Sequence, residues 1–563
     1  MRWNLRPIPP EEQVKQLAQS LGIPETIAAL LLQRGIDSFE AAKAFYRPDL
    51  DQLHDPFLMK DMDKAVARIE VAMAQEQNIL VYGDYDVDGT SSVALMASYL
   101  QSYYPNITTY IPDRYNEGYG VSLAGIDYAA DNDCALIIAL DCGVKAVDQV
   151  AYAKQKGIDF IICDHHRPGD QLPDAIAVLD PKREDCEYPY KELCGCGVGF
   201  KLVQALHLKR GEDFESLYPY LDLVATAIGA DIVPVTGENR ILAYYGMQVI
   251  NQLPRPGFKA ILNQIKKESF TITDVVFIIA PRINAAGRMK HGLHAVALLM
   301  EQNLEQATQM ATEIEAYNLS RRETDAIITQ EALAQITENN EETDQFTTVV
   351  FDPDWHKGVI GIVASRLIET YYRPTLVFTK SGDVLAASAR SVRGFDVYKA
   401  IAACSDHLIQ FGGHKYAAGL TIKPENYQAF KKAFEQEVKN TIEPSMLVPE
   451  LLVDLQLELS EINPKFYRLL RQFAPFGPGN MTPVFMTQGL RDTGWAKGVG
   501  ENNAHLKLTA TQGNKEQFGA IGFGLGDCLD RIKNKPFKAA YTLDENSWQG
   551  KSSLQLKLKD LKE

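Results

Sequence analysis

The chain has 563 residues, of which 46% are hydrophobic and 23% charged, so several domains can each bury a core. A formal net charge of −16 argues against a protein that binds nucleic acid over its whole surface, although it allows a local basic groove. No apolar run approaches the ~20 residues of a membrane helix, and no apolar core follows the N-terminal basic residues, so we expect no membrane contact and no signal peptide. The eight cysteines lack the paired spacing of a zinc site and read as reduced thiols, which predicts a cytoplasmic protein.

The first half of the chain predicts helices followed by an α/β domain. Residues 1–64 are expected to form an N-terminal helical segment, because their apolar residues recur with a helical period. From 65 to 245, apolar runs alternate with helical stretches, which predicts a parallel β-sheet covered on both faces. The expected strands are 78–84, 106–113, 134–143, 159–166 and 175–181.

The second half predicts a helical bridge, a second α/β domain and a small barrel. Residues 246–345 read mainly as helix, and the stretch 303–336 is long enough to connect two domains. The second α/β domain is expected over 346–445. Residues 446–563 contain several short β-patterned runs, which favour a β-barrel that resembles an OB-fold.

Acidic residues and histidines follow several expected strands of the first α/β domain. They are Asp84, Asp86 and Asp88 after the first strand, Asp141 after the third, Asp164, His165 and His166 after the fourth, and Asp231 after a later helical run. Ligands bind beyond the carboxyl ends of parallel strands, so we expect these side chains to meet at one rim. The strand period of two predicts that the first three acids share one side, with Gly89 then turning the chain into the next helix.

Carboxylates gathered in this way repel each other unless cations bind between them. Oxygen and imidazole ligands without thiolate suit Mn²⁺ or Mg²⁺, and the imidazole favours Mn²⁺. The candidate ligands exceed what one octahedral ion uses, which predicts two ions about 3.5–4 Å apart and hydrolysis at phosphorus. An EF-hand calcium loop is excluded, because its position 12 must be Glu and falls here on Leu95, and because a strand precedes the motif.

Five motifs together resemble the DHH phosphoesterase family. They are GDYDVDGT (83–90), LDCGV (140–144), DHH (164–166), GADIVP (229–234) and PRINAAGRM (281–289), while FGGHKYAAGL (411–420) resembles the glycine-rich motif of the DHH-associated domain. With the terminal barrel, nearly the full chain is similar to the single-strand-specific 5′-to-3′ exonucleases of this family. The resemblance implies phosphodiester hydrolysis in single-stranded DNA, a role in DNA repair and recombination, and a helicase and a single-strand-binding protein as partners.

The resemblance also implies roles for individual residues. Metal binding falls to Asp84, Asp86, Asp88, Asp141, His165 and Asp231, and catalysis to Asp141, His165 and His166. In several relatives a histidine stands at the position of Asp84, and Asp164 is expected to orient a histidine. Contacts to phosphate and strand fall to Arg114, Tyr119, Arg282, Asn284, Arg288, Ser388, Arg390, Gly412, Gly413 and His414. Arginine forks suit phosphate oxygens, glycines let backbone amides approach a phosphate, and tyrosine can stack on a base.

Three alternatives stay open. The chain could be a phosphodiesterase of short oligonucleotides or cyclic dinucleotides, a phosphoanhydride hydrolase, or a catalytically inactive scaffold that binds single strands. Smaller members of the family typically lack the helical bridge and the barrel, and an inactive scaffold is expected to have lost metal ligands. The leading hypothesis is therefore an exonuclease whose two α/β lobes enclose a channel too narrow for a duplex.

Overall fold

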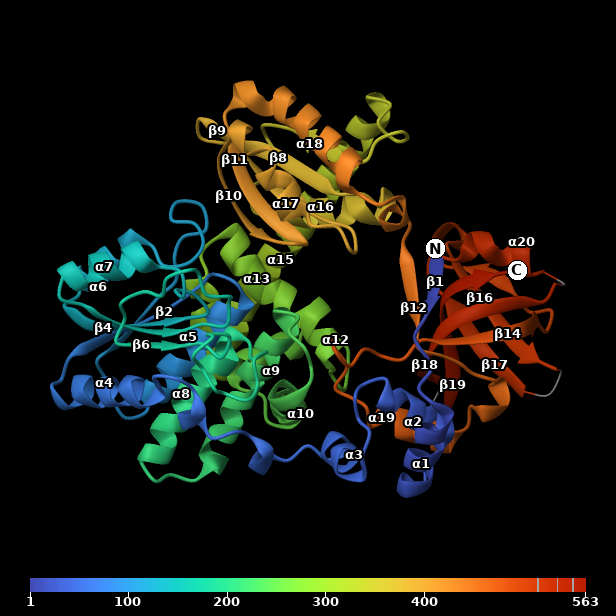
Figure 1. The fold of residues 1–563 in the computed structure, drawn as a ribbon, viewed down its shortest axis with the longest axis horizontal. Coiled ribbons are helices and arrows are strands. Elements are labelled where there is room, and N and C mark those ends of the chain that lie inside the picture. Colours follow the sequence, from blue (N-terminus) through green and yellow to red (C-terminus); the bar gives the residue numbers. More distant parts are fainter. Residues whose placement is uncertain (514–515, 534, 549–550) are drawn as a thin grey trace.

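The computed structural model describes residues 1–513, 516–533, 535–548 and 551–563. The chain forms three bodies, namely a first α/β lobe, a second lobe and a barrel, and both chain ends lie on the barrel body (Figure 1). No helix within the described ranges combines the length and apolarity that a membrane crossing requires.

The first lobe contains a parallel five-stranded sheet in the order β3-β2-β4-β5-β6. Its strands are β2 (Asn78–Gly83), β3 (Ile107–Tyr110), β4 (Cys134–Leu140), β5 (Asp159–Cys163) and β6 (Ala177–Leu179). Its helices are α4 (Met62–Ala74), α5 (Val87–Gln101), α6 (Leu123–Asp131), α7 (Val147–Gln155), α8 (Gly195–Lys209), α9 (Leu221–Ala230) and α10 (Gly237–Gln252). Leu136 and Ile138 of β4 belong to one buried cluster, and Ile137 and Ala139 to another. Both faces of the sheet are therefore buried, which confirms the expected α/β architecture.

A helical bridge connects the first lobe to the second. It comprises α11 (Pro256–Leu262), α12 (Ile272–Asp274), α13 (Ala280–Met289), α14 (Leu293–Met300) and α15 (Leu304–Glu338). The 35 residues of α15 span about 50 Å at ~1.5 Å per residue. Near its start, Ala311 and Ile314 are buried in the core of the first lobe, and near its end, Ala332 and Ile336 are buried in the second. One helix thus belongs to two cores, as the sequence predicted.

The second lobe is built on a mixed five-stranded sheet in the order β10-β11-β9-β8-β7. Its elements are β7 (Thr348–Phe351), α16 (Ile360–Thr370), β8 (Thr375–Ser381), β9 (Val384–Arg390), α17 (Val397–Ala402), β10 (Leu408–His414), β11 (Ala417–Ile422) and α18 (Tyr427–Thr441). The apolar runs TTVVF (347–351) and PTLVF (374–378) correspond to β7 and β8. The sequence did not predict β9, β10 and β11, because Ala and Gly occupy many positions where strands usually carry branched or aromatic residues.

The C-terminal region closes into a barrel of five strands. The ring runs β14-β18-β19-β17-β16 and returns to β14 through a further pairing between β14 and β16. The elements of this region are β12 (Glu450–Val453), β13 (Leu455–Gln456), α19 (Pro464–Arg471), β14 (Phe485–Asp492), β15 (Lys497–Val499), β16 (His505–Gln512), β17 (Glu516–Gly522), α20 (Leu529–Ile532), β18 (Phe537–Trp548) and β19 (Lys551–Lys562). The expectation of a small OB-like barrel is confirmed.

The N-terminal segment differs from the expected run of helices. It begins with a strand, β1 (Arg2–Leu5), which pairs in parallel with β12. The indole Nε1 of Trp3 donates a hydrogen bond of 2.7 Å to Asp560 Oδ2 in the last strand. The helices α1 (Glu11–Leu21), α2 (Glu25–Leu32) and α3 (Phe39–Tyr46) share a hydrophobic core with the barrel. No local pattern could predict β1, because the strand that pairs with it lies about 450 residues later in the chain.

Candidate active site

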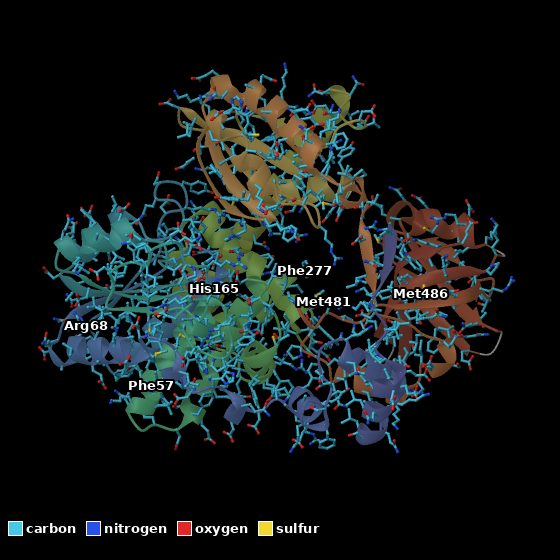
Figure 2. All side chains as sticks on the ribbon, in the orientation of Figure 1. Phe57, Arg68, His165, Phe277, Met481 and Met486 are labelled. Atoms are coloured by element: carbon cyan, nitrogen blue, oxygen red, sulfur yellow. The ribbon has the colours of Figure 1, made fainter. Side chains whose placement is uncertain are left out.

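The imidazole of His165, a residue of the first lobe that Figure 2 labels, faces three carboxylates. Its Nε2 atom is 3.3 Å from Asp141 Oδ1, 3.5 Å from Asp231 Oδ2 and 4.0 Å from Asp88 Oδ2. The three carboxylates come from the end of β4, the end of α9 and the first turn of α5. The carboxyl edge of the sheet thus gathers side chains that are far apart in sequence, as expected.

Several buried polar atoms at this rim have no hydrogen-bond partner. They are both ring nitrogens of His165, Asp141 Oδ1 and Asp84 Oδ2. Such atoms are rare in folded proteins, because an unpaired buried polar group costs free energy. Two sets of donor groups, Asp141 with His165 and His166 and Asp88 with His165 and Asp231, each lie within 4.8 Å of one another. Carboxylate oxygens with imidazole nitrogens fit Mn²⁺ or Mg²⁺, so the residues present fit a divalent cation centre.

The protonation preferences of these groups also favour a bound cation. Burial, followed by the charge of Asp86, raises the pKa of Asp88 to about 7. Burial and neighbouring carboxylates also raise the pKa values of Asp84, Asp141 and Asp231 well above their usual range. Burial lowers the pKa of His165 to about 3, which keeps its imidazole neutral and able to coordinate a metal. A bound cation reverses the penalty on the charged carboxylates.

Asp164 fixes the geometry of the two histidines that follow it. Its Oδ1 accepts hydrogen bonds from the backbone N–H groups of His165 and His166, at 2.7 and 3.1 Å, and lies 2.8 Å from His166 Nδ1. Its Oδ2 accepts from the Val144 N–H at 2.9 Å. Burial raises the pKa of Asp164, but the hydrogen bond to His166, the charge of His166, the Val144 N–H and the charge of His165 together outweigh burial and lower that pKa to about 2. Asp164 therefore stays ionised and orients a histidine, as predicted.

Of the three acids after β2, only Asp88 lies in a helix, and none lies in the strand, which corrects the expectation that all three share one side of an extended stretch. The strand ends at Gly83, and Asp86 is the N-cap of α5, accepting from the Gly89 N–H at 3.1 Å. The period of two therefore does not apply to Asp86 and Asp88. Gly89 is also not the turn, because it lies inside α5, where a Cβ atom would stand 2.3 Å from the carbonyl oxygen of Asp84.

The N-terminus of α8 holds Asp88, and sequence analysis missed this contact. The N–H groups of Gly195 and Cys196 donate to the two carboxylate oxygens of Asp88, each at 2.7 Å. A Cβ atom on Gly195 would stand 2.5 Å from Asp141 Oδ1, so the absence of a side chain there makes room for a second ligand. The available signal was the glycine-rich start of a helix, which commonly receives an anion. The cysteines of this stretch are free and buried, as expected.

Arginines from both lobes form an unneutralised cluster near the metal centre. Arg288 Nη1 donates to the Gly358 carbonyl at 2.8 Å, and Arg390 Nη1 donates to Ser388 Oγ at 3.1 Å. Burial, followed by the positive charges of Arg114 and Arg390, lowers the pKa of Arg288 to about 9. In the described part of the chain, none of these three arginines forms an ion pair with a carboxylate. The arginine cluster, Arg114, Arg288 and Arg390, therefore offers uncompensated charge for an anion, and its role in binding phosphate stays a prediction.

Two contacts show how closely the arginine cluster is packed. The guanidinium of Arg114 lies over the ring of Tyr85, 4.4 Å from its centroid, and Tyr85 stands between two of the acidic residues. Gly361 in the first turn of α16 faces the other end of the cluster, where a Cβ atom would stand 2.8 Å from Ser388 Oγ. Only a glycine leaves space there for the serine hydroxyl. The sequence signal for Gly361 was its place at the start of a helix.

One predicted phosphate ligand on α13, Arg282, is engaged elsewhere. Arg282 forms an ion pair with Glu315 of α15, with Nε 2.7 Å from Oε2, and donates to the Ile278 carbonyl. Its guanidinium is therefore already neutralised, and the structure does not support its assignment to phosphate. Asn284 lies half-buried on α13, and its role stays a prediction.

The second lobe meets the metal centre through the end of β10. The ring of His414 stacks on the ring of His166, with centroids 6.2 Å apart and planes inclined by 11°. Gly412 and Gly413 precede His414 and are exposed. The hydroxyl of Tyr119 lies 3.2 Å from His166 Nε2, and 56% of the Tyr119 side chain is exposed. Tyr119 and His414, two residues predicted to contact the DNA strand, therefore both lie against His166.

Comparison with known proteins identifies three family domains in this chain. The DHH family N-terminal domain matches residues 78–228, the DHHA1 domain 343–440 and the RecJ OB domain 453–560. The single-stranded-DNA-specific exonuclease RecJ of Bacillus subtilis is 35% identical, over 100% of this chain and 70% of the relative. The RecJ of Salmonella typhimurium is 34% identical, over 89% of this chain and 90% of the relative. RecJ of Thermus thermophilus, solved with Mn²⁺, covers 100% of this chain and 79% of that chain, with 26% identity and a TM-score of 0.86; its structure with Mg²⁺ has a TM-score of 0.81.

Proposed function

The chain belongs to the RecJ family of single-stranded-DNA-specific exonucleases, and from this membership we propose that it removes mononucleotides from the 5′ end of single-stranded DNA. The reaction is hydrolysis of a phosphodiester bond that depends on a divalent metal, Mn²⁺ or Mg²⁺. The observation that carries this proposal is the convergence of the Asp88, Asp141 and Asp231 carboxylates on the neutral imidazole of His165, within 4.0 Å.

The side chains of the metal centre would hold two cations, with Asp84 and Asp86 beside the groups around His165. When bound, two divalent ions supply an activated water and stabilise charge on the oxygens of an in-line displacement. Asp164 holds His166 through its Nδ1 atom and so directs the other ring nitrogen toward Tyr119. The N-terminus of α8 holds Asp88 in place through two backbone donors. The protein thus supplies an oriented and largely buried set of ligands.

The 5′-to-3′ polarity is attributed to the arginine cluster. A terminal 5′ phosphate carries more charge than an internal one, and three unpaired guanidinium groups favour the more highly charged end. With the terminal phosphate bound there, the next phosphate of the strand would lie at the metal centre. Each cut would then release a single nucleotide.

We attribute the preference for single strands to the short distance between the two lobes at the metal centre. Stacking of His414 on His166 brings the second lobe against the metal centre, and it joins a predicted contact to the DNA strand, His414, with a predicted catalytic residue, His166. A duplex is too bulky for such a gap, whereas a single strand can pass between the lobes. The barrel, as an OB-fold, would bind the strand before it enters.

We further infer a place in DNA repair and recombination, with a helicase and a single-strand-binding protein as partners. Degradation of one strand from its 5′ end requires a process that separates the strands first, which is the work of a helicase. The free cysteines are consistent with a reducing, cytoplasmic location.

A direct test uses purified protein with Mn²⁺ and 3′-labelled single strands that carry either a 5′ phosphate or a 5′ hydroxyl. We expect mononucleotide release from the 5′ end, faster with the phosphate, and loss of activity when the metal is chelated. Duplex DNA with blunt ends serves as the comparison substrate. Equal rates on duplex and single strand, or release from the 3′ end first, would contradict the proposal. Faster turnover of two-nucleotide than of fifty-nucleotide strands would favour a short-oligonucleotide phosphodiesterase instead.

A further inference from the structure

Three cations lie on the side of the metal centre away from the arginine cluster. In the strand order β3-β2-β4-β5-β6, Arg114 follows β3 at one edge of the sheet. Arg167 follows β5 directly after the two histidines, and Lys182 follows β6 at the opposite edge. Lys145 follows β4. In the strand order, the carboxylates that follow β2 and β4 therefore lie between Arg114 of the arginine cluster and the cations Arg167 and Lys182.

These three cations lie near one another, because Arg167, the residue after His166, lines a cavity with Lys182, and Lys145 contacts the same loop at Gly169. Burial, followed by the positive charges of His166, Lys145, Lys182 and Arg167, lowers the pKa of His414. The charge of Lys182 also acts on His165 and on Asp231. Lys145 reaches the loop that carries Arg167, because its Cγ atom lies 3.7 Å from where a Cβ atom of Gly169 would stand. The set Lys145, Arg167 and Lys182 is called the lysine–arginine patch below.

Much of the charge of the lysine–arginine patch is not neutralised. In the described part of the chain, Lys145 and Arg167 form no ion pair, and Lys182 has one long contact, 3.8 Å, with Glu192. Arg167 and Lys182 line a cavity of about 760 Å³ between the loops after β5 and β6. The other cations of this cavity are engaged, Arg183 with Asp61 and Asp185, and Lys191 with a backbone carbonyl.

The carboxylates of the same cavity set a limit on where an anion can bind. They are Asp170, Glu184, Asp185 and Glu192. They balance the cations over the cavity as a whole, so the cavity is not a general anion site. Among the described residues, the two cations of this cavity without a close ion pair or a bond to a backbone carbonyl are Arg167, which directly follows His166, and Lys182. The uncompensated positive charge therefore lies at the end of the cavity next to His166.

We propose that Lys145, Arg167 and Lys182 form a second phosphate subsite, which binds the phosphate on the 3′ side of the bond being cut. The proposal rests on the proposed function, in which the 5′ phosphate occupies the arginine cluster and the next phosphate lies at the metal centre. A DNA strand with its 5′ phosphate at the β3 edge of the sheet and its second phosphate at the metal centre continues toward the β6 edge. There its third phosphate reaches the lysine–arginine patch. The subsite recognises backbone charge and is therefore indifferent to base sequence.

The test compares two short substrates of different length. A 5′-phosphorylated dinucleotide has two phosphates and fills the arginine cluster and the metal centre, whereas a trinucleotide adds the third. In the wild-type protein with Mn²⁺, we expect kcat/KM to be about 10- to 100-fold higher for the trinucleotide than for the dinucleotide, because a charge-assisted hydrogen bond to the third phosphate contributes a factor of about this size. Replacement of all three residues (Lys145→Gln, Arg167→Gln, Lys182→Gln) should remove that difference and leave the dinucleotide within about two-fold.

A chemical control isolates the charge of the third phosphate. A trinucleotide with a neutral methylphosphonate at that position should lose its advantage in the wild type and lose nothing further in the triple variant. This comparison of charged and neutral trinucleotides tests the subsite even if the dinucleotide is cut slowly. Lys154→Gln is the matched control, because Lys154 is an exposed lysine of the same lobe that pairs with Asp174. Arg167→Gln alone provides the same comparison should the triple variant fold poorly.

Two results would overturn the subsite. Equal losses on the dinucleotide and the trinucleotide would mean that these cations only offset the acidic charge of the metal centre. Equal kcat/KM values for the two substrates in the wild type would mean that no third phosphate is bound. Failure of the wild type to cut single strands of any length would instead contradict the proposed function itself.

Discussion

The Nε2 atom of His165 faces the Oδ1 atom of Asp141 across 3.3 Å, and neither atom has a hydrogen-bond partner. With its pKa lowered to about 3 by burial, the imidazole is neutral at physiological pH. A buried imidazole and a buried carboxylate that face each other without forming a hydrogen bond are arranged as two ligands of one cation. The role of Asp141 can be tested through that relationship.

Asp141→Asn should separate strand binding from hydrolysis. We expect single-strand affinity to stay within about three-fold while kcat falls by about 10²–10⁴-fold, since a ligand of the reacting centre is lost. Melting curves with and without Mn²⁺ provide the control. Mn²⁺ should raise the Tm of the wild type but not of the variant. Without metal, the variant should melt at the same temperature or higher, because a buried carboxylate with a raised pKa is removed. Equal loss of binding and hydrolysis would indicate misfolding.

Gly195→Ala should disturb the metal centre by adding one methyl group. The new Cβ atom would stand 2.5 Å from Asp141 Oδ1, so the carboxylate must move. We expect Mn²⁺ affinity, measured by titration calorimetry, to fall by about 10-fold or more. Gly197→Ala is the matched control on the same helix, because its Cβ would meet Leu193 at an ordinary contact distance of 3.4 Å. Similar Mn²⁺ affinities in the two variants would refute the steric argument.

Asp164→Asn should weaken metal binding although Asp164 itself is not expected to bind metal. The amide cannot accept on both sides, so it loses part of the set of bonds to His165, His166 and Val144. Loss of such an orienting partner typically costs about 10- to 100-fold in metal affinity. Asp174→Asn, at an exposed carboxylate of the same lobe, serves as the control. An unchanged Mn²⁺ affinity in Asp164→Asn would show that the histidines are held by other contacts.

Arg390→Gln should reduce the preference for 5′-phosphorylated ends. One charge-assisted contact contributes roughly 1.5–3 kcal/mol, so KM for a phosphorylated strand should rise by about 10- to 100-fold. The rate on a 5′-hydroxyl strand should change little. The nearby Arg393 contacts Glu450 at 3.7 Å, and Arg393→Gln should leave both substrates unaffected. An equal loss of activity on the 5′-phosphorylated and the 5′-hydroxyl strand would show that Arg390 does not bind the terminal phosphate.

Trp3→Ala should destabilise the barrel without affecting the metal centre. The variant loses the hydrogen bond to Asp560 and the contact of Lys562 with the indole ring, 4.8 Å from its centroid. We expect a loss of about 1–3 kcal/mol in the free energy of unfolding of the barrel body. Phe39→Ala, at a residue that is 51% exposed, should cost much less. Hydrolysis of dinucleotides should be retained, and its loss would contradict the separation of barrel and metal centre.

The parts of the fold that sequence predicts are those whose signal is local. The strands β2 to β6 fall within two to three residues of the expected ends, because buried parallel strands are short continuous apolar runs. Strand β10 ends in Gly412-Gly413-His414 and has no such run. It forms because its backbone pairs with β11. Pairing partners chosen by tertiary structure leave little trace in local composition.

The same distinction between local signals and tertiary contacts applies to the candidate active site. The chemistry of Asp141 and His165 could be predicted, because acids and histidines after strands converge on one rim. The position of Asp88 could not, because it depends on where β2 ends and on donors from α8, more than 100 residues later. The ion pair between Arg282 and Glu315 could not be predicted either, because the sequence shows which residues are cations but not which carboxylates they contact. Residue type identifies candidate ligands, and only the fold shows which are free.

The pairing of β1 with β12 has a consequence for protein synthesis. The Arg2 and Glu450 side chains that meet across this pair are 448 residues apart in the chain. At ~5–20 residues per second, a ribosome needs roughly 20–90 s to make the intervening polypeptide. Throughout that time the apolar faces of α1 and α2 lack the barrel residues that cover them in the finished protein. The segment from β1 to α2 is therefore made before both lobes that carry the nuclease site, yet it completes its fold only after they have been translated.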